Sequence, residues 1–413
     1  MTTTQEVDRV ARPASRTIWF VGGAILFGHL LVDMYGAMGP SILGVLEIHC
    51  HLKPSETAWL LGIGAFSGGI SQPVCAWLSD RYNWRGFGGL GLMLAAFFLC
   101  LVGMATSFGS LLPIYILGMV GLGMFHPIAA ASMGGLSELR HSSNISLFFV
   151  VGMLGGVIGA TVTPRLITGT AGFSAMYWAI APGFVVAWVL HQAIHRLPHR
   201  QASHRTSPLV LDKIRARWII VGFLYIASVL RFSVNLALAY LYVRWVQDAT
   251  GASHPDWTLS EIARYSVPMV GNLNACMIVG MALGGIGAGF FVRRGGERWP
   301  MVLCPIVFAP AVALFPHATL AWSYILSVLV GIGFGAMIPV SIALSQRLLP
   351  HRTSLASGLM MGGSWAIAMV GPPLAEFGVQ HLGIGWSFYL TASVLCLAGL
   401  VVIPLHVFSR DLF

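Results

Sequence analysis

Long runs of uncharged, apolar residues recur from one end of this 413-residue chain to the other. Hydrophobic residues make up 56% of the chain and charged residues only 9%, whereas charged residues make up about 25% of an ordinary soluble domain. A soluble fold could not bury this much apolar surface, but a run of about 20 apolar residues can cross a lipid bilayer. The sequence therefore predicts an all-α integral membrane protein with the lipid bilayer as its surroundings.

Twelve of these runs are long enough to predict transmembrane helices. They lie near residues 18–43, 57–79, 87–106, 109–133, 144–167, 172–194, 218–244, 267–291, 300–317, 319–345, 354–379 and 384–407. Residues 1–17 are polar and of mixed charge, and the apolar run behind them is too long for a signal peptide. We therefore expect the first span to remain uncleaved, with the amino terminus in the cytoplasm.

The distribution of positive charge tests this topology. With the amino terminus inside, 18 of the 23 Lys and Arg residues fall on the cytoplasmic side, four fall outside, and Arg231 lies within a span. This asymmetry is what the positive-inside rule predicts. We therefore expect a multi-pass protein of the inner (cytoplasmic) membrane with both termini in the cytoplasm. Because topology accounts for the net charge of +9, we expect no nucleic-acid partner.

A polar, basic segment at residues 195–217 divides the spans into two sets of six. Gly121-Leu122-Gly123 in the fourth span is echoed by Gly331-Ile332-Gly333 in the tenth. The fifth and eleventh spans also carry corresponding glycines, namely Gly152, Gly155, Gly156 and Gly159 in one and Gly358, Gly362, Gly363 and Gly371 in the other. Small residues at such spacing let helices approach closely in lipid, and such repetition is typical of transporters.

We therefore predict two pseudo-symmetric six-helix bundles. The first covers residues 18–194 and the second residues 218–407, and the cytoplasmic linker 195–217 joins them. Cytoplasmic tails are expected at residues 1–17 and 408–413.

The loop after the second span contains a recognisable charged motif. It reads Ala76-Trp77-Leu78-Ser79-Asp80-Arg81-Tyr82-Asn83-Trp84-Arg85 and resembles the signature loop of the major facilitator superfamily. The resemblance implies that Asp80, Arg81 and Arg85 form a conformational clamp between the two halves. The equivalent loop of the second half keeps Arg293 but has no acid at the matching place.

Further motifs resemble the fosmidomycin-resistance branch of the same superfamily. They are Gly28-His29-Leu30-Leu31-Val32-Asp33, Gly121-Leu122-Gly123-Met124-Phe125-His126-Pro127, and Leu348-Leu349-Pro350-His351-Arg352 followed by Ser357-Gly358-Leu359. The resemblance extends over nearly the whole chain. It implies the major facilitator fold, with two bundles that rock about a central site, and export of a drug as the activity.

Ionisable residues within spans are functional candidates, because an unpaired charge in lipid costs several kcal/mol. Asp33 is the most central acid, and His29 lies four residues earlier on the same helical face. We predict that these two residues accept the coupling proton; the alternative is a carboxylate satisfied locally by hydroxyl groups or an Arg. Arg231 lies at a similar depth in the seventh span, so we hypothesise that it either pairs with Asp33 or binds an anionic substrate group.

Other polar and aromatic residues in the spans are candidates for substrate binding. They are His126, Asn235, Gln72 and Trp365. For His126 the alternative is a hydrogen-bonded side chain at the bend made by Pro127, and for the others it is packing. Glu376 and Arg165 lie near the outer ends of equivalent spans, where they form either part of an outer gate or charges at the membrane surface.

The sequence predicts no metal site and no cofactor. Two histidine groups, His191 with His195 and His199, and His49 with Cys50 and His51, do not complete the ligand set that zinc prefers. The six cysteines show no paired spacing. No glycine-rich phosphate loop ending in Lys-Ser or Lys-Thr is present, so the energy for transport is expected from an ion or substrate gradient.

Together these features predict a secondary active transporter that works by alternating access as a monomer. The predicted activity is proton-coupled efflux of a small drug-like or anionic compound. One alternative is uptake of a carboxylate or other nutrient, and another is a membrane sensor or binding protein that does not transport. An enzyme is not expected, because no nucleophile and base cluster in the sequence.

Overall fold

The structure is a computed structural model that describes residues 15–82, 86–136, 141–196, 214–292, 296–349 and 352–404. These residues are almost all helical, and none of them lies in a strand. The first half contains α1 (Ser15–Ser41), α2 (Leu43–His49), α3 (Pro54–Tyr82), α4 (Phe87–Cys100), α5 (Phe108–Gly135), α6 (His141–Thr168) and α7 (Ile180–His195). The second half contains α8 (Ile214–Ser253), α9 (Leu259–Phe291), α10 (Arg298–Ala313), α11 (Leu320–Leu348), α12 (Thr353–Gly358), α13 (Ser364–Ile367), α14 (Gly371–Leu382) and α15 (Ile384–Leu400).

Each of the twelve predicted spans coincides with a helical path, which confirms the all-α membrane fold. Within the described ranges, ten helical stretches are long and apolar enough to cross a membrane. The remaining two paths are α3, which is 29 residues long but carries Ser, Gln, Gly and Pro, and the shorter apolar helix α15.

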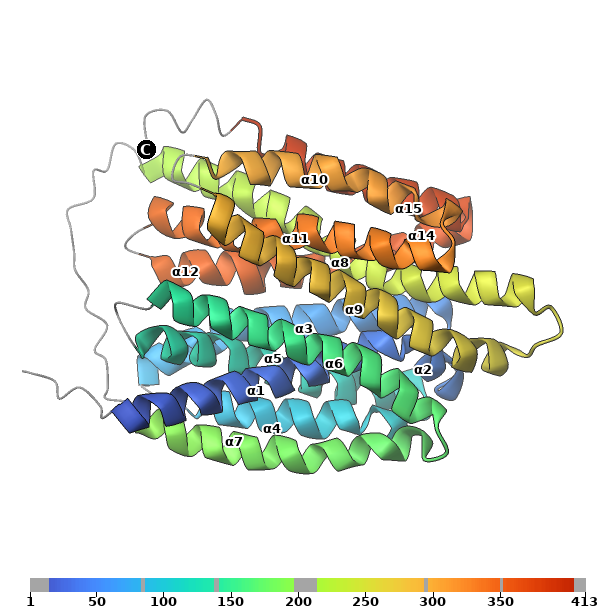
Figure 1. Cartoon of the computed structure of the whole chain (residues 1–413), viewed down its shortest axis with the longest axis horizontal. Coiled ribbons are helices and arrows are strands. Elements are labelled where there is room, and N and C mark those ends of the chain that lie inside the picture. Colours follow the sequence, from blue (N-terminus) through green and yellow to red (C-terminus); the bar gives the residue numbers. More distant parts are fainter. Residues whose placement is uncertain are drawn as a thin grey trace, which may run out of the picture.

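The seventh and eighth spans are longer than predicted. α8 continues from the predicted end at residue 244 to Ser253, and α9 begins at Leu259 instead of 267. A helix of 40 residues is about 60 Å long, roughly twice the thickness of the hydrocarbon core. The hairpin between α8 and α9 therefore extends beyond the other helices, as seen at the right of Figure 1.

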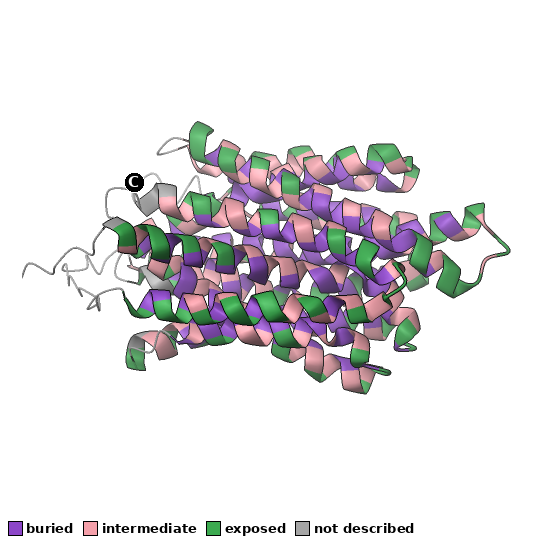
Figure 2. Cartoon of the chain, turned by 60° about the horizontal axis from the view of Figure 1, so that its bottom comes forward, coloured by how far each residue is buried: buried purple, intermediate pink, exposed green. Residues whose placement is uncertain are grey.

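The two halves lie side by side, with the first half in the lower part of Figure 1 and the second half above it. Both ends of the described chain lie at the left, which we call the terminal end; the opposite end is called the far end. Helices α3 and α6 of the first half face α9, α13 and α14 of the second. Buried residues gather between the helices and exposed ones on the outer surface (Figure 2), as expected where lipid surrounds the bundle.

Two glycines on α6 set its distance from α1. A Cβ atom at Gly155 or at Gly159 would overlap the backbone of Leu30 or Met34, respectively, on α1. The two helices therefore touch backbone to backbone, which is the role predicted for small residues at this spacing. This contact positions the polar residues of α1 against α6.

The eleventh predicted span is not one continuous α-helix. Between α12 and α14 the chain forms a π-helical turn at Leu359–Gly363, then α13, then a 3₁₀ turn at Ala368–Val370. The hydroxyl of Ser364 donates to the carbonyl of Leu359 at 2.9 Å and so supports the π turn. This turn packs against Gly69 of α3, so the irregular backbone lies at the contact between the halves.

The α1–α6 contact leads to a first prediction. Replacing Gly159 by Ala should lower the free energy of unfolding by about 1–3 kcal/mol, because the added methyl group would force the two backbones apart. The midpoint of thermal unfolding in detergent measures the effect. The matched control is Gly289→Ala on α9, where a Cβ meets nothing within 4 Å. Equal midpoints for the two variants would contradict the close contact.

Candidate functional site

Three ionisable side chains meet in the interior of the first half. His29 and Asp33 come from α1, and His126 comes from α5. His29 Nε2 lies 3.4 Å from Asp33 Oδ2, and His126 Nε2 lies 3.1 Å from Asp33 Oδ1. Each carboxylate oxygen therefore has its own imidazole, and we call these three residues the carboxylate–histidine cluster.

The other nitrogen of each imidazole faces a backbone carbonyl. His29 Nδ1 lies 2.7 Å from the carbonyl oxygen of Phe148 on α6, and His126 Nδ1 lies 2.7 Å from that of Leu122. A carbonyl oxygen can only accept a hydrogen bond, so both Nδ1 atoms carry a hydrogen. The Nε2 atom of each ring is then protonated only when that imidazole is charged.

The number of hydrogen bonds within the cluster depends on how many protons it holds. If Asp33 were ionised and both imidazoles neutral, lone pairs on nitrogen would face lone pairs on oxygen at both contacts. One added proton turns the 3.1 Å contact between His126 and Asp33 into a hydrogen bond, and a second one would do the same at His29. The geometry of the cluster is thus compatible with the gain and loss of a proton.

The three side chains of the cluster differ in their exposure. The side chain of His29 is 2% exposed and stacks on the ring of Phe148 at 3.6 Å between centroids. The side chains of His126 and Asp33 remain 17% and 26% exposed. A Cβ atom at Gly152 of α6 would overlap His29 and lie 2.5 Å from Asp33 Oδ2, so only glycine leaves room for the pair.

The second half contributes a buried cation. Arg231 on α8 is 1% exposed, and its Nε and Nη2 atoms have no hydrogen-bond partner. Its Nη1 atom donates to the carbonyl of Phe334 on α11 at 3.4 Å, and its guanidinium lies 3.9 Å from the centre of the Phe232 ring. No acidic side chain of the described residues pairs with this guanidinium, so its positive charge is not neutralised by any of them.

The predicted pairing of Arg231 with Asp33 does not occur in this structure. The partners of Asp33 are the two histidines of its own half. Among the described residues, neither a hydroxyl group nor an Arg is bonded to this carboxylate. Helix spacing revealed His29, but Asp33 and His126 are 93 residues apart in the chain and are joined only by the packing of α1 against α5.

The remaining predicted binding residues lie at the contact between the halves or close to it. Trp365 packs on Phe232 with ring centroids 5.0 Å apart, in a cluster that also contains Ala65 of α3. Gln72 lies on α3 against Gly362 of the π turn. Asn235 is buried on α8 and donates to the sulfur atom of Met277 at 3.5 Å. Among the described residues no hydrogen bond joins these side chains to the carboxylate–histidine cluster.

Most of the predicted clamp lies outside the described residues. This holds for Arg85, for Arg293 and for the side chain of Asp80, whose backbone lies in the last turns of α3. The guanidinium of Arg81 is exposed and lies 5.5 Å and 5.8 Å from the ring centres of Trp77 and Tyr82. The clamp therefore stays a prediction.

The carboxylate–histidine cluster also has ligand atoms within 4.8 Å of one another, a spacing that a metal ion can use. This set was not predicted from the sequence, in which only the other histidine groups stood out as metal candidates. A structural zinc site has four protein ligands, whereas a catalytic one has three and a water molecule, and the cluster offers three ligands. The 3.1 Å contact between His126 and Asp33 already has the length of a direct hydrogen bond, which a shared proton explains.

Two bundles of apolar helices with ionisable side chains in their interior are typical of membrane transporters. The model of the Major Facilitator Superfamily matches residues 25–263 and 236–411. The chain therefore belongs to the major facilitator superfamily.

Two relatives support this assignment. The fosmidomycin resistance protein of Escherichia coli is 22% identical over 380 residues, which cover 92% of this chain and 91% of that protein. An uncharacterised MFS-type transporter of Bacillus subtilis, YfnC, is 22% identical over 359 residues, which cover 83% and 82% of the two chains. The resemblance to the fosmidomycin-resistance protein, first seen in three motifs, is thus confirmed over nearly the whole chain.

Solved structures show the same fold. The nucleoside transporter NupG superposes with a TM-score of 0.68 at 12% identity, covering 94% of this chain and 99% of NupG. A bacterial homologue of the human lysosomal transporter Spinster, in an inward-facing and occupied conformation, has a TM-score of 0.68 at 17% identity, covering 95% and 97%.

The position of the hydrogens in the cluster can be tested directly. In nitrogen-15 NMR spectra of the purified protein at alkaline pH, neutral His29 and His126 should both carry hydrogen on Nδ1, because each Nδ1 faces a carbonyl. His49 serves as an internal control, since its Nε2 atom faces the carbonyl of Gly103 at 3.0 Å and should carry the hydrogen instead. Signals are assigned by substituting each histidine by Gln; hydrogen on Nε2 of neutral His126 would contradict the proposed proton site.

Proposed function

We propose that this transporter exports a small drug-like or anionic organic compound from the cytoplasm in exchange for protons. The observation that carries the proposal is the carboxylate–histidine cluster, in which two imidazole Nε2 atoms face the two oxygens of Asp33. An acid in this setting is costly to leave charged and unpaired, so its proton content depends on its surroundings. A change in the exposure of Asp33 between two conformations then changes its affinity for protons, which is what coupling requires.

Arg231 supports an anionic group on the substrate. Two of its guanidinium nitrogens have no partner, and burial of an uncompensated charge costs several kcal/mol. A carboxylate or phosphonate on the substrate would offset that cost by accepting hydrogen bonds from these nitrogens. The neighbouring rings of Phe232 and Trp365 supply an apolar surface for the rest of the molecule.

Gln72, Asn235 and His126 are the proposed polar contacts around such a molecule. Gln72 and His126 are partly exposed within the first half, and Asn235 lies one helical turn beyond Arg231. Substrate bound between these residues would touch both halves, so its presence would favour the conformations in which the halves enclose it.

The direction of transport is inferred from similarity. The fosmidomycin resistance protein of Escherichia coli matches 92% of this chain, and resistance to a drug is most simply achieved by exporting it. The residues of the site favour an anionic substrate whether it is exported or taken up. A test of export must therefore also be able to detect uptake of a carboxylate.

Fosmidomycin is the first substrate to test. A host that expresses this chain should tolerate a higher inhibitory concentration than the same host without it, and Arg231→Gln should abolish the difference through loss of the anion contact. The matched control is Arg215→Gln, whose exposed side chain lies in the first turn of α8, the helix that carries Arg231. An unchanged inhibitory concentration with the unaltered chain would contradict export of this drug, and a lower one would indicate uptake.

Asp33→Asn tests the coupling. In inverted membrane vesicles, a pH gradient should drive fosmidomycin flux through the unaltered protein, and this flux should fall about tenfold or more in the variant. Exchange of fosmidomycin without a gradient should persist, because the amide that replaces the carboxylate would no longer bind the proton while Arg231 still binds the anion. Asp256→Asn, in the exposed turn between α8 and α9, is the control. Gradient-driven flux that survives in the Asp33 variant would rule out this residue as the proton site.

A further inference from the structure

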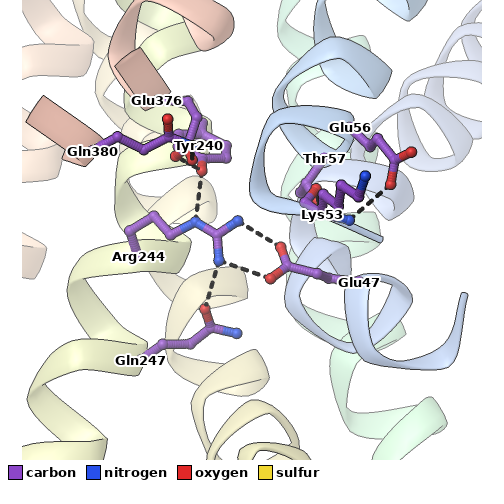
Figure 3. Close-up of polar contacts among 9 residues, drawn as sticks. All are labelled: Glu47, Lys53, Glu56, Thr57, Tyr240, Arg244, Gln247, Glu376 and Gln380. Carbon is purple, nitrogen blue, oxygen red and sulfur yellow. Dashed lines mark hydrogen bonds and ion pairs between the residues drawn. The ribbon is translucent and has the colours of Figure 1, made fainter. Parts of the chain in front are cut away.

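At the far end of the bundle a group of polar side chains joins the two halves (Figure 3). Glu47 comes from α2, and Arg244 comes from α8. The Nη1 and Nη2 atoms of Arg244 donate to Oε1 and Oε2 of Glu47 at 2.9 Å and 2.6 Å. The pair is therefore bidentate, and its side chains are only 12% and 11% exposed.

Contacts of α2 with α9 and α8 of the second half hold Glu47 beside Arg244. A Cβ atom at Gly44, one turn before Glu47, would lie 2.7 Å from Nε2 of Gln247 and 3.2 Å from Cγ1 of Val243. Gln247 also accepts a hydrogen bond from Nη1 of Arg244, at 3.4 Å. The short helix α2 packs mainly on α9 and also approaches α8 at Gly44, and Glu47 accepts the hydrogen bonds of the Arg244 guanidinium.

Arg244 has a second acidic neighbour, which belongs to its own half. Its Nε atom donates to the hydroxyl of Tyr240 at 2.7 Å, and that hydroxyl donates to Oε2 of Glu376 on α14. Gln380 donates to the other carboxylate oxygen of Glu376 at 2.6 Å. Glu376 is 4% exposed, so it is not the membrane-surface charge that was one of its predicted roles.

The Glu47–Arg244 ion pair differs from the other polar contacts between the halves. Arg165 Nη2 donates to Asn272 at 3.0 Å, and Arg264 Nη2 donates to the carbonyl of Thr168 at 3.2 Å, so each of these has a neutral partner. In the part of the chain that the structure describes, Glu47–Arg244 is the one ion pair that joins the halves. Glu376 and Arg165, considered together from sequence as a gate, belong to separate contacts.

We propose that the Glu47–Arg244 ion pair locks the far end closed, and that Glu376, acting through Tyr240, is the counter-ion that takes over Arg244 when the lock opens. Opening separates α2 from α8 and removes Glu47. Tyr240, Arg244 and Glu376 all belong to the second half and move together. Arg244 therefore keeps an acidic partner in the open state and is not left as a buried, unpaired cation.

This charge exchange predicts opposite effects for the two acids. Without the charge of Glu47 the closed state loses its ion pair, so the open state gains population. Without the charge of Glu376 the open state loses its counter-ion, so the closed state gains population. A merely structural role for both acids would instead destabilise the fold without shifting the two populations in opposite directions.

Distances between spin labels at the far end measure these populations. Labels are attached at Ser55→Cys on α3 and Ala252→Cys on α8, both exposed positions, after the native cysteines are replaced. Glu47→Gln should raise the ratio of the long-distance to the short-distance population about tenfold, and Glu376→Gln should lower it. The control is Glu56→Gln, an acid at the same end whose Oε2 accepts from the backbone N–H of Lys53 in its own half at 2.8 Å. It should leave the ratio unchanged.

Exchanging the charges of Glu47 and Arg244 distinguishes two cases. In one, Arg244 pairs with Glu47 alone; in the other, it is shared between Glu47 and Glu376. A simple pair would be restored in the double variant E47R/R244E. Under the proposal the new acid at position 244 faces Glu376 through Tyr240, so the closed population should return only when Glu376→Gln is added as well.

Two results would overturn the proposal. An unchanged distance distribution in Glu47→Gln would exclude the lock, and full recovery by the double exchange alone would exclude the role of Glu376. Should the exchanged variants fail to fold, the opposite shifts expected for Glu47→Gln and Glu376→Gln still decide. The measurement needs no transported solute, so its failure is distinguishable from a failure to export fosmidomycin.

Discussion

An acidic side chain inside a membrane bundle must be neutralised or hydrogen-bonded, and the first half is arranged around this constraint at Asp33. His29 and His126 approach its two oxygens, and each imidazole is oriented by a backbone carbonyl, that of Phe148 or Leu122. Such close approach is possible only because Gly152 leaves space on α6. The same requirement for a partner makes the cluster sensitive to protons, so stability and proposed coupling have one physical origin.

The second half carries two buried or nearly buried arginines, and their positive charges are accommodated in two different ways. Arg231, near the middle of its helix, has no acidic partner among the described residues, which leaves it available to a ligand. Arg244, three to four turns further along the same helix, lies between two acids from different halves. One arginine is thus suited to binding and the other to holding the halves together. The two-fold repeat of helices does not extend to this chemistry.

Much of the fold was predictable because the signals are local. Hydropathy located the twelve paths, and helical periodicity placed His29 beside Asp33. The rest depends on contacts between helices distant in the chain. Asp33 and His126 are 93 residues apart, and Glu47 and Arg244 are 197 apart. No local pattern in a single sequence reports such pairs. The π turn at Leu359–Gly363 was missed for a similar reason, since packing against α3 contributes to it.

The sequence by itself determined that this chain is a helical membrane protein, because the bilayer admits few other structures for chains so apolar. The major facilitator type was indicated by the resemblance of its motifs to that superfamily. The sequence also showed which spans carry ionisable residues, since these are rare among the apolar residues of a span. Only the tertiary structure decided how those charges are paired. Asp33 is joined to histidines of its own half and not to Arg231, because glycine contacts bring α1 and α6 together and α5 packs against α1.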